Sequence, residues 1–195
     1  MNKHTIQISD NDYKEVLKTL GYEKDSLDES VKELLLVCES ELKKVVNPCF
    51  VYRVFDYKDE SLVDSGFELE GKTIKEHLDG FNKCACLCAT LGGEVDALIR
   101  KKQVTSMAEA MMIDNMASYL IEQVCDRAEE IIMKNFDGCD KTFRYGLGYG
   151  DFPIERQKDF LDMLEASRQV GVHVNEASML MPTKSVTCLI GIKDD

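Results

Sequence analysis

Residues 144–153 read Arg144-Tyr145-Gly146-Leu147-Gly148-Tyr149-Gly150-Asp151-Phe152-Pro153 and place three glycines at alternate positions. Glycine lets a backbone turn sharply and approach a ligand closely, because it has no side chain. Asp151 and Pro153 indicate the start of a helix, with a capping carboxylate and a proline in the first turn. A glycine loop that leads into a helix directs free N–H groups and the positive end of the helix dipole toward an anion.

The residues around these glycines add two kinds of contact. Arg144 offers a planar, two-pronged grip on a carboxylate or phosphate. Tyr145 and Tyr149 offer flat faces for a ring. The segment therefore predicts a pocket for a small anion or a nucleoside. The alternative is a tight surface turn whose arginine pairs with a neighbouring acid. The spacing matches neither G-x-G-x-x-G nor G-x-x-x-x-G-K-[ST].

Composition and charge narrow the class of protein. A chain of 195 residues with 44% hydrophobic and 31% charged residues suits one soluble domain, so we expect a single domain over 1–195. The formal net charge of −12 disfavours a nucleic-acid partner. No apolar run reaches the length of a membrane span and the N-terminus lacks an apolar signal segment, so we expect a cytoplasmic protein whose eight cysteines are reduced.

The hydrophobic pattern predicts interspersed helices and strands. Apolar residues at helical spacing and turn signals predict helices over 10–20, 26–46, 73–78, 94–102 and 106–134, and one after Pro153 that ends before Gly171. Alternating or β-branched runs predict strands over 5–8, 50–57, 67–70, 83–90, 172–174 and 185–192. Because there is no regular βαβ alternation, we expect an α+β domain with a mostly antiparallel, twisted sheet and several helices.

The run Lys83-Cys84-Ala85-Cys86-Leu87-Cys88 places three thiols on one face of a strand. Such a row suggests a metal or redox site. However, metal sites usually take ligands from more than one element, and no second cluster of cysteines or histidines lies nearby in the sequence. We therefore interpret Cys84, Cys86 and Cys88 as packing residues of a buried strand.

Several motifs together resemble the C-terminal activation domain of cobalamin-dependent methionine synthase. They are Arg144-x-x-x-Gly148-Tyr149 followed by Pro153, then the segments 175–182 (NEASMLMP) and 184–186 (KSV), with a looser match at 89–96 (ATLGGEVD). The resemblance covers about residues 30–195 and is weakest over 1–30, which we regard as an N-terminal extension. It implies the α+β architecture of that family.

The resemblance also implies a site for S-adenosylmethionine (AdoMet). Arg144 would hold the carboxylate of AdoMet, while Tyr145, Gly146, Gly148 and Tyr149 would shape the cleft for its adenosine part. In the family a glutamate on the preceding helix helps to bind the cationic part of AdoMet, and that position is Ser118 here. Glu122, one turn further on, or Asp114 would replace it; the alternative is that both acids are solvated. The sequence ends at Asp195, before the position of a family tyrosine that reaches the pocket, and a family aspartate that contacts the base has no match.

The function implied is that of a stand-alone reactivation component for a cobalamin-dependent methionine synthase. It would bind AdoMet and position the methyl group for reductive methylation of cob(II)alamin, as an accessory component rather than an independent catalyst. Cobalamin would enter only through a partner, namely the cobalamin-binding module of a methionine synthase or another corrinoid protein, with a flavodoxin-like protein as electron donor. The alternative is a binding module of the same fold that docks on a corrinoid protein or senses a nucleoside without methyl transfer. A third possibility, an independent enzyme such as a hydrolase, has no nucleophile–base set in the sequence to support it.

Overall fold

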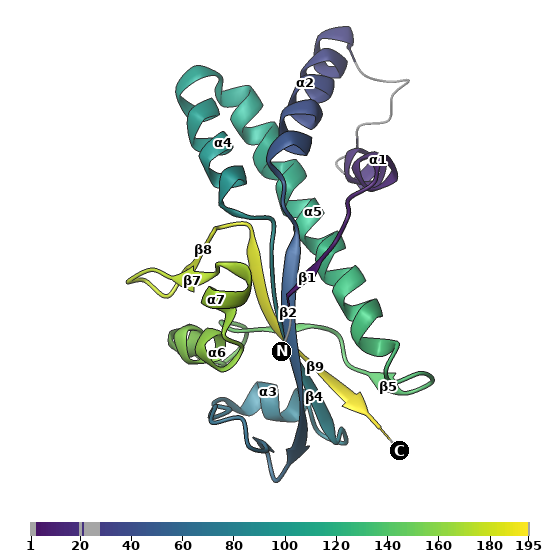
Figure 1. Cartoon of the computed structure of the whole chain (residues 1–195), viewed down its shortest axis with the longest axis vertical. Helices are drawn as coiled ribbons and strands as arrows, with labels where there is room; N and C mark the ends of the chain where they lie inside the picture. Colours follow the sequence, from purple (N-terminus) through teal and green to yellow (C-terminus); the bar gives the residue numbers. More distant parts are fainter. Residues whose placement is uncertain (1–2, 20, 22–27, 195) are drawn as a thin grey trace.

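A computed structural model describes residues 3–19, 21 and 28–194, and its main element is a curled antiparallel sheet (Figure 1). Within these residues seven strands form the sheet in the order β1-β2-β4-β9-β5, with β3 paired to β2 and β6 paired to β9. The long strands are β2 (Cys49–Lys58), β4 (Lys83–Thr90) and β9 (Ser185–Lys193). The short ones are β1 (His4–Thr5), β3 (Ser61–Leu62), β5 (Asp140–Lys141) and β6 (Tyr145–Gly146), and a separate hairpin joins β7 (His173–Val174) to β8 (Leu180–Met181).

The central strand β4 is buried on both faces. It pairs with β2 on one side and β9 on the other, with Cys86 opposite Arg53 and Leu189. Alternate residues of a strand point to opposite faces. Ala85, Leu87 and Ala89 belong to one hydrophobic cluster, whereas the cysteines between them belong to a second. The sheet therefore separates two cores.

Within the described residues, four helices pack on the first face, and three short helices, one of them preceded by a 3₁₀ turn, lie on the second (Figure 1). The first group contains α1 (Asp10–Thr19), α2 (Glu29–Val45), α4 (Gly93–Thr105) and the longest helix, α5 (Met107–Met133). Ser106 caps α5, because its hydroxyl accepts a hydrogen bond from the backbone N–H of Glu109. The second group contains α3 (Lys72–His77), the 3₁₀ turn η1 (Ile154–Arg156), α6 (Gln157–Met163) and α7 (Ala166–Val170).

The α+β class and the antiparallel sheet confirm the prediction from the sequence. The predicted strands over 50–57, 83–90 and 185–192 and the predicted helices over 73–78, 94–102 and 106–134 all form, with ends that shift by up to three residues. Strand β1 is shorter than the predicted strand over 5–8. The predicted end of the first helix at Leu20 and the predicted start of the second at Ser26 lie outside the described residues.

Two predicted elements are wrong. Residues 67–70 do not form a strand, although Phe67 and Leu69 are buried as the alternation requires. The single helix predicted after Pro153 is divided into η1, α6 and α7, and the chain turns at Glu165, whose φ of 49° lies in the left-handed region. A residue in that conformation ends a right-handed helix.

The thiols of Cys84, Cys86 and Cys88 are fully buried in the second core, as the packing interpretation predicts. Burial and the neighbouring Cys84 raise the pKa of the Cys86 thiol well above its ordinary range, so it stays protonated. Among the described residues no group of three or more His, Cys, Asp or Glu side chains is arranged to hold a metal ion. In the same part of the chain no helix combines the length and apolar character needed to cross a bilayer.

Candidate functional site

The glycine-rich segment forms a compact loop after β6. The loop is closed by backbone hydrogen bonds from Gly148 N to Phe152 O (2.9 Å) and from Phe152 N to Tyr149 O (3.0 Å). Gly148 and Gly150 have φ values of +87° and +57°, which side-chain-bearing residues rarely adopt. A methyl group on Gly150 would lie 2.5 Å from the hydroxyl oxygen of Thr73. The glycines thus serve a sharp turn that packs closely against α3.

Asp151 caps a different helix from the one predicted. Its carboxylate accepts hydrogen bonds from the backbone N–H groups of Lys72 (2.8 Å) and Thr73 (3.0 Å) at the start of α3. The hydroxyl of Thr73 and these two N–H groups lower the pKa of Asp151 to about 2. Pro153 precedes η1 rather than lying in its first turn. The prediction that Asp151 and Pro153 begin one helix is therefore wrong, because the carboxylate binds the free N–H groups of α3 instead.

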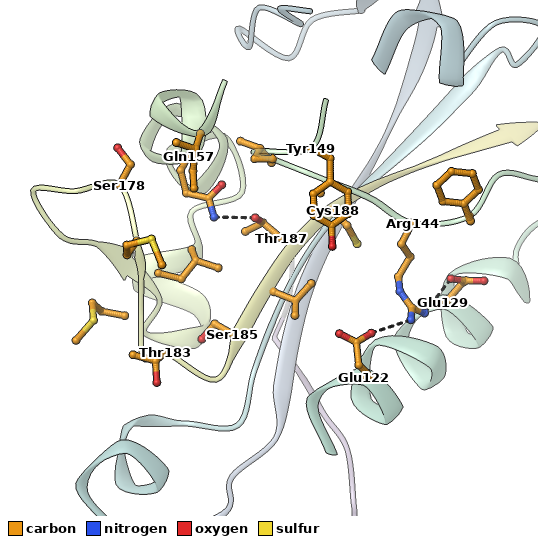
Figure 2. A pocket seen from close by; sticks show the side chains of 18 of the residues that line it. Glu122, Glu129, Arg144, Tyr149, Gln157, Ser178, Thr183, Ser185, Thr187 and Cys188 are labelled. Atoms are coloured by element: carbon orange, nitrogen blue, oxygen red, sulfur yellow. Dashed lines mark hydrogen bonds and ion pairs between the residues drawn. The ribbon is translucent and has the colours of Figure 1, made fainter. Parts of the chain in front are cut away.

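A cleft of about 830 Å³ opens beside this loop (Figure 2). Its walls come from α5, the segment from Lys141 to Tyr149, the start of η1 and α6, and the β7–β8 hairpin. Strand β6 pairs with β9 only at Leu189 and Cys188, so the first residues of β9 extend beyond β6 and line the cleft. The volume lies within the range of about 300–1,000 Å³ that is usual for small-molecule sites.

Arg144 lies on the α5 side of the cleft, in a cluster of charged side chains (Figure 2). Its Nη1 contacts Asp126 Oδ1 at 2.7 Å and Glu129 Oε2 at 3.2 Å, and its Nη2 contacts Glu122 Oε2 at 3.1 Å. Lys141 of β5 also pairs with Glu129. Burial alone would lower the pKa of Arg144, but the hydrogen bond to Asp126 and the surrounding anions outweigh it and raise the pKa. The guanidinium is therefore charged, and three acids and two cations leave this cluster with one net negative charge.

Four of the six predicted site residues line the cleft, namely Arg144, Gly146, Tyr149 and Glu122. Tyr149 is 61% exposed, and Phe143 and Met179 are further exposed apolar residues that line the cleft. Glu122 is paired with Arg144 although its side chain is 57% exposed, so the pairing of this arginine with a neighbouring acid, which was the alternative to a ligand pocket, does occur. The role of these four residues in binding a ligand remains a prediction.

The other two predicted site residues, Tyr145 and Gly148, are not among the residues that line the cleft. Tyr145 packs against the second core, and its hydroxyl donates a hydrogen bond to Thr73 Oγ1 at 2.8 Å. Gly148 faces Ile154, which a methyl group on it would approach to 3.5 Å. Both residues therefore belong to the internal packing of the loop and do not line the cleft.

The wall formed by residues 183–185 is fixed by two helices. Asp96 of α4 accepts hydrogen bonds from Thr183 through its backbone N–H (2.8 Å) and its hydroxyl (2.6 Å). Lys184 Nζ lies 2.8 Å from both Asp114 Oδ1 and Ser118 Oγ on α5. Ser118 thus holds a lysine, and Asp114 is ion-paired rather than merely solvated.

Sequence reasoning missed most residues of this site, among them Glu129, Asp126, Gln157 and Thr187. Asp126 follows Glu122 by one helical turn, and this spacing was a usable signal that both acids face the same neighbour. Gln157 and Thr187 gave no signal, because they belong to no motif. Their side chains meet in the buried end of the cleft, where Gln157 Nε2 donates to Thr187 Oγ1 at 2.8 Å.

These features define an α+β domain in which a glycine loop and a charged helix face enclose an open cleft. No model of a known protein family matches the sequence, and no curated protein sequence matches it. Among solved structures, the fold is similar to the "Crystal Structure of the MetH Reactivation Domain bound to AdoHcy", with a TM-score of 0.57 and 18% sequence identity. The match covers 100% of this chain and 79% of that chain. The chain therefore has the fold of a MetH reactivation domain.

Proposed function

We propose that this protein binds an AdoMet-type ligand in the cleft beside Arg144 and acts as a stand-alone reactivation component for a cobalamin-dependent methionine synthase. The observation that carries the proposal is that a cleft of small-molecule size lies beside Arg144 in a fold whose solved neighbour was determined with S-adenosylhomocysteine (AdoHcy) bound. The motif order from Arg144 to Ile192, which resembles the activation domain of methionine synthase, supports it further.

The residues of the cleft suit the parts of such a ligand. A methionyl tail carries a carboxylate and an ammonium group, and the charged cluster presents the guanidinium of Arg144 together with acids of α5. The exposed residue Tyr149 offers a ring face for an adenine, and its ring packs against Gly146, where an added methyl group would meet it at 3.6 Å. A methyl group transferred from AdoMet to cobalt needs no nucleophile from this chain. The task of these residues is to bind the ligand, orient its sulfonium and exclude water.

Isothermal titration calorimetry with AdoMet and AdoHcy tests the ligand. Arg144→Ala should weaken binding by well over tenfold, because truncating one partner of a hydrogen-bonded charge pair typically costs about 2–5 kcal/mol. Arg127→Ala is the control, since Arg127 lies on α5 and pairs with Asp12, and neither residue lines the cleft. Absence of heat with the wild type, or equal binding by Arg144→Ala, would contradict the proposed site.

A reconstituted reaction separates methyl transfer from mere docking. The protein would be mixed with a cob(II)alamin-loaded module of a methionine synthase, a flavodoxin-like electron donor and AdoMet, and methylcobalamin followed by its visible spectrum. Formation of methylcobalamin that depends on this protein supports the reactivation role. A stable complex without methylcobalamin supports the alternative, a binding module of the same fold that docks on a corrinoid protein or senses a nucleoside.

A further inference from the structure

The three acidic neighbours of Arg144 accept hydrogen bonds from only some of the N–H donors of its guanidinium. Arginine has five N–H donors in a fixed plane. Two contacts fall on Nη1, to Asp126 and Glu129, and one falls on Nη2, to Glu122. Within residues 3–19, 21 and 28–194 the Nε–H has no hydrogen-bond acceptor. The remaining donors are therefore the Nε–H and the second hydrogen of Nη2.

The three acids differ in how firmly they are held. The side chains of Glu122 and Asp126 are 57% and 61% exposed, and ion pairs at such positions contribute little and exchange readily with water. The Glu129 side chain is only 14% exposed and contacts two cations, Arg144 through Oε2 and Lys141 of β5 through Oε1. Glu129 thus joins α5 to two neighbouring segments, and it is the fixed member of the cluster.

We infer that Glu129 is a positioning residue that holds Arg144 by Nη1 and leaves the Nε–Nη2 edge available for the carboxylate of a ligand. Figure 2 shows Arg144 with Glu129 and Glu122, both from α5, at the wall of the cleft. The exposed acids Glu122 and Asp126 can then release the guanidinium, or turn toward a cationic group of the ligand. The guanidinium of Arg144 keeps its position in either case, because Glu129 still holds it. The ligand part of this inference rests on the proposed function, whereas the anchoring is a property of the protein alone.

A physical reason favours such an anchor. An arginine that is free to rotate loses side-chain freedom when it binds, and this loss weakens the affinity. A guanidinium already held by one edge keeps the opposite edge in place for a planar, two-pronged contact. Glu129 would therefore affect only ligands that carry a carboxylate.

The anchoring can be measured without any ligand. In protein labelled with ¹⁵N-arginine, a held guanidinium shows slow rotation about its Nε–Cζ bond and a slowly exchanging Nε–H signal. We expect both signs for Arg144 in the wild type, and their loss in Glu129→Gln. Glu130→Gln is the matched control, because Glu130 is the next residue of α5, is exposed and has no contact with Arg144. An unchanged Arg144 signal in Glu129→Gln would overturn the inference.

Titration with two ligands then separates positioning from a general structural role. AdoHcy carries the amino-acid carboxylate, whereas 5′-methylthioadenosine has the same nucleoside without it. Glu129→Gln should lower the affinity for AdoHcy about tenfold, the order expected for one charge-assisted hydrogen bond. The affinity for 5′-methylthioadenosine should stay within about twofold of the wild-type value. Equal loss for both ligands, or tighter AdoHcy binding through removal of a competing acid, would overturn the inference. If wild type binds neither ligand, the proposed ligand is wrong, and the ¹⁵N measurement alone decides whether Glu129 positions Arg144.

Discussion

Asp151 and Thr73 lie 78 positions apart in the sequence, yet the carboxylate of Asp151 accepts hydrogen bonds from both the backbone N–H and the hydroxyl of Thr73. The two oxygen–donor distances are 3.0 Å and 2.5 Å. The start of α3 leaves N–H groups without partners inside the helix, and an acid at that end satisfies them. This contact fixes the back of the glycine loop against α3, while Arg144 and Tyr149 line the cleft on the other side.

The Asp151 cap should make stability depend on acidity. The pKa of Asp151 is lowered to about 2 in the folded protein from an ordinary value of 3.8, so the unfolded chain binds the proton first as pH falls. The stabilisation is thus fully present above about pH 4 and is lost as the pH falls through about 2. Asp151→Asn should lower the urea midpoint at pH 6, and its difference from the wild type should shrink between pH 4 and pH 2.

Asp137→Asn is the control for this experiment, because Asp137 is an exposed acid in a loop that precedes the site. It should leave the midpoint unchanged at pH 6. A difference between wild type and Asp151→Asn that stays constant down to pH 2 would show that the carboxylate does not cap α3 in solution.

The close contact of Gly150 with α3 should be visible in a comparison with Gly138. Both glycines have positive φ, +57° and +78°, but a methyl group on Gly138 meets nothing within 4 Å. Gly138→Ala should cost only the backbone strain, about 1–2 kcal/mol. Gly150→Ala should cost a further 1–3 kcal/mol or so, because the methyl group collides with Thr73. Equal urea unfolding free energies for the two variants would rule out the close contact.

If the cysteines of β4 serve packing, the unfolding free energies of Cys86 variants should follow a definite order. Cys86 is fully buried in the second core, so a serine hydroxyl there would have to find a hydrogen-bond partner in an apolar setting. Cys86→Ser should lower the unfolding free energy by about 1–3 kcal/mol. Cys86→Ala, which introduces no polar group, should cost less. A serine variant as stable as the wild type would contradict the packing role.

The long elements of the fold were predictable because their signals are local. The periodicity of α5 and the apolar runs of β4 and β9 extend over several turns or pleats. The apolar residues of each element pack into a core, on one face of α5 and on both faces of β4 and β9. Phe67 and Leu69 alternate in the same way, yet a strand also needs a neighbour with free backbone groups, which the alternation does not report. The left-handed turn at Glu165 likewise falls on a residue whose type gives no warning.

The site was predictable only in part, because some of its features depend on local sequence and others depend on contacts between distant segments. The glycine motif identified the loop and Arg144, because tight turns and guanidinium contacts require particular residue types. The direction in which Asp151 points, the pairing of Arg144 with α5 and the contact of Lys184 with Ser118 all depend on how distant segments pack. The tyrosines show this limit: both offered a ring in the sequence, and their rings meet edge to face at 5.9 Å, but Tyr145 is half-buried against the second core whereas Tyr149 is exposed at the cleft.

Those two tyrosines should respond in opposite ways to substitution. Tyr149 is 61% exposed and lines the cleft, so Tyr149→Ala should change the unfolding free energy by less than about 0.5 kcal/mol. The loss of its ring should lower the affinity for AdoHcy by about 3- to 10-fold, if the ring stacks on the adenine. Tyr145→Phe removes the hydroxyl that bonds to Thr73 Oγ1 at 2.8 Å, so it should cost about 1 kcal/mol of stability and leave AdoHcy affinity nearly unchanged. Urea unfolding and calorimetric titration of both variants test this pair of effects. Should Tyr145→Phe weaken AdoHcy as much as Tyr149→Ala does, the nucleoside would have to lie on the α3 side of the loop, outside the cleft that contains Arg144.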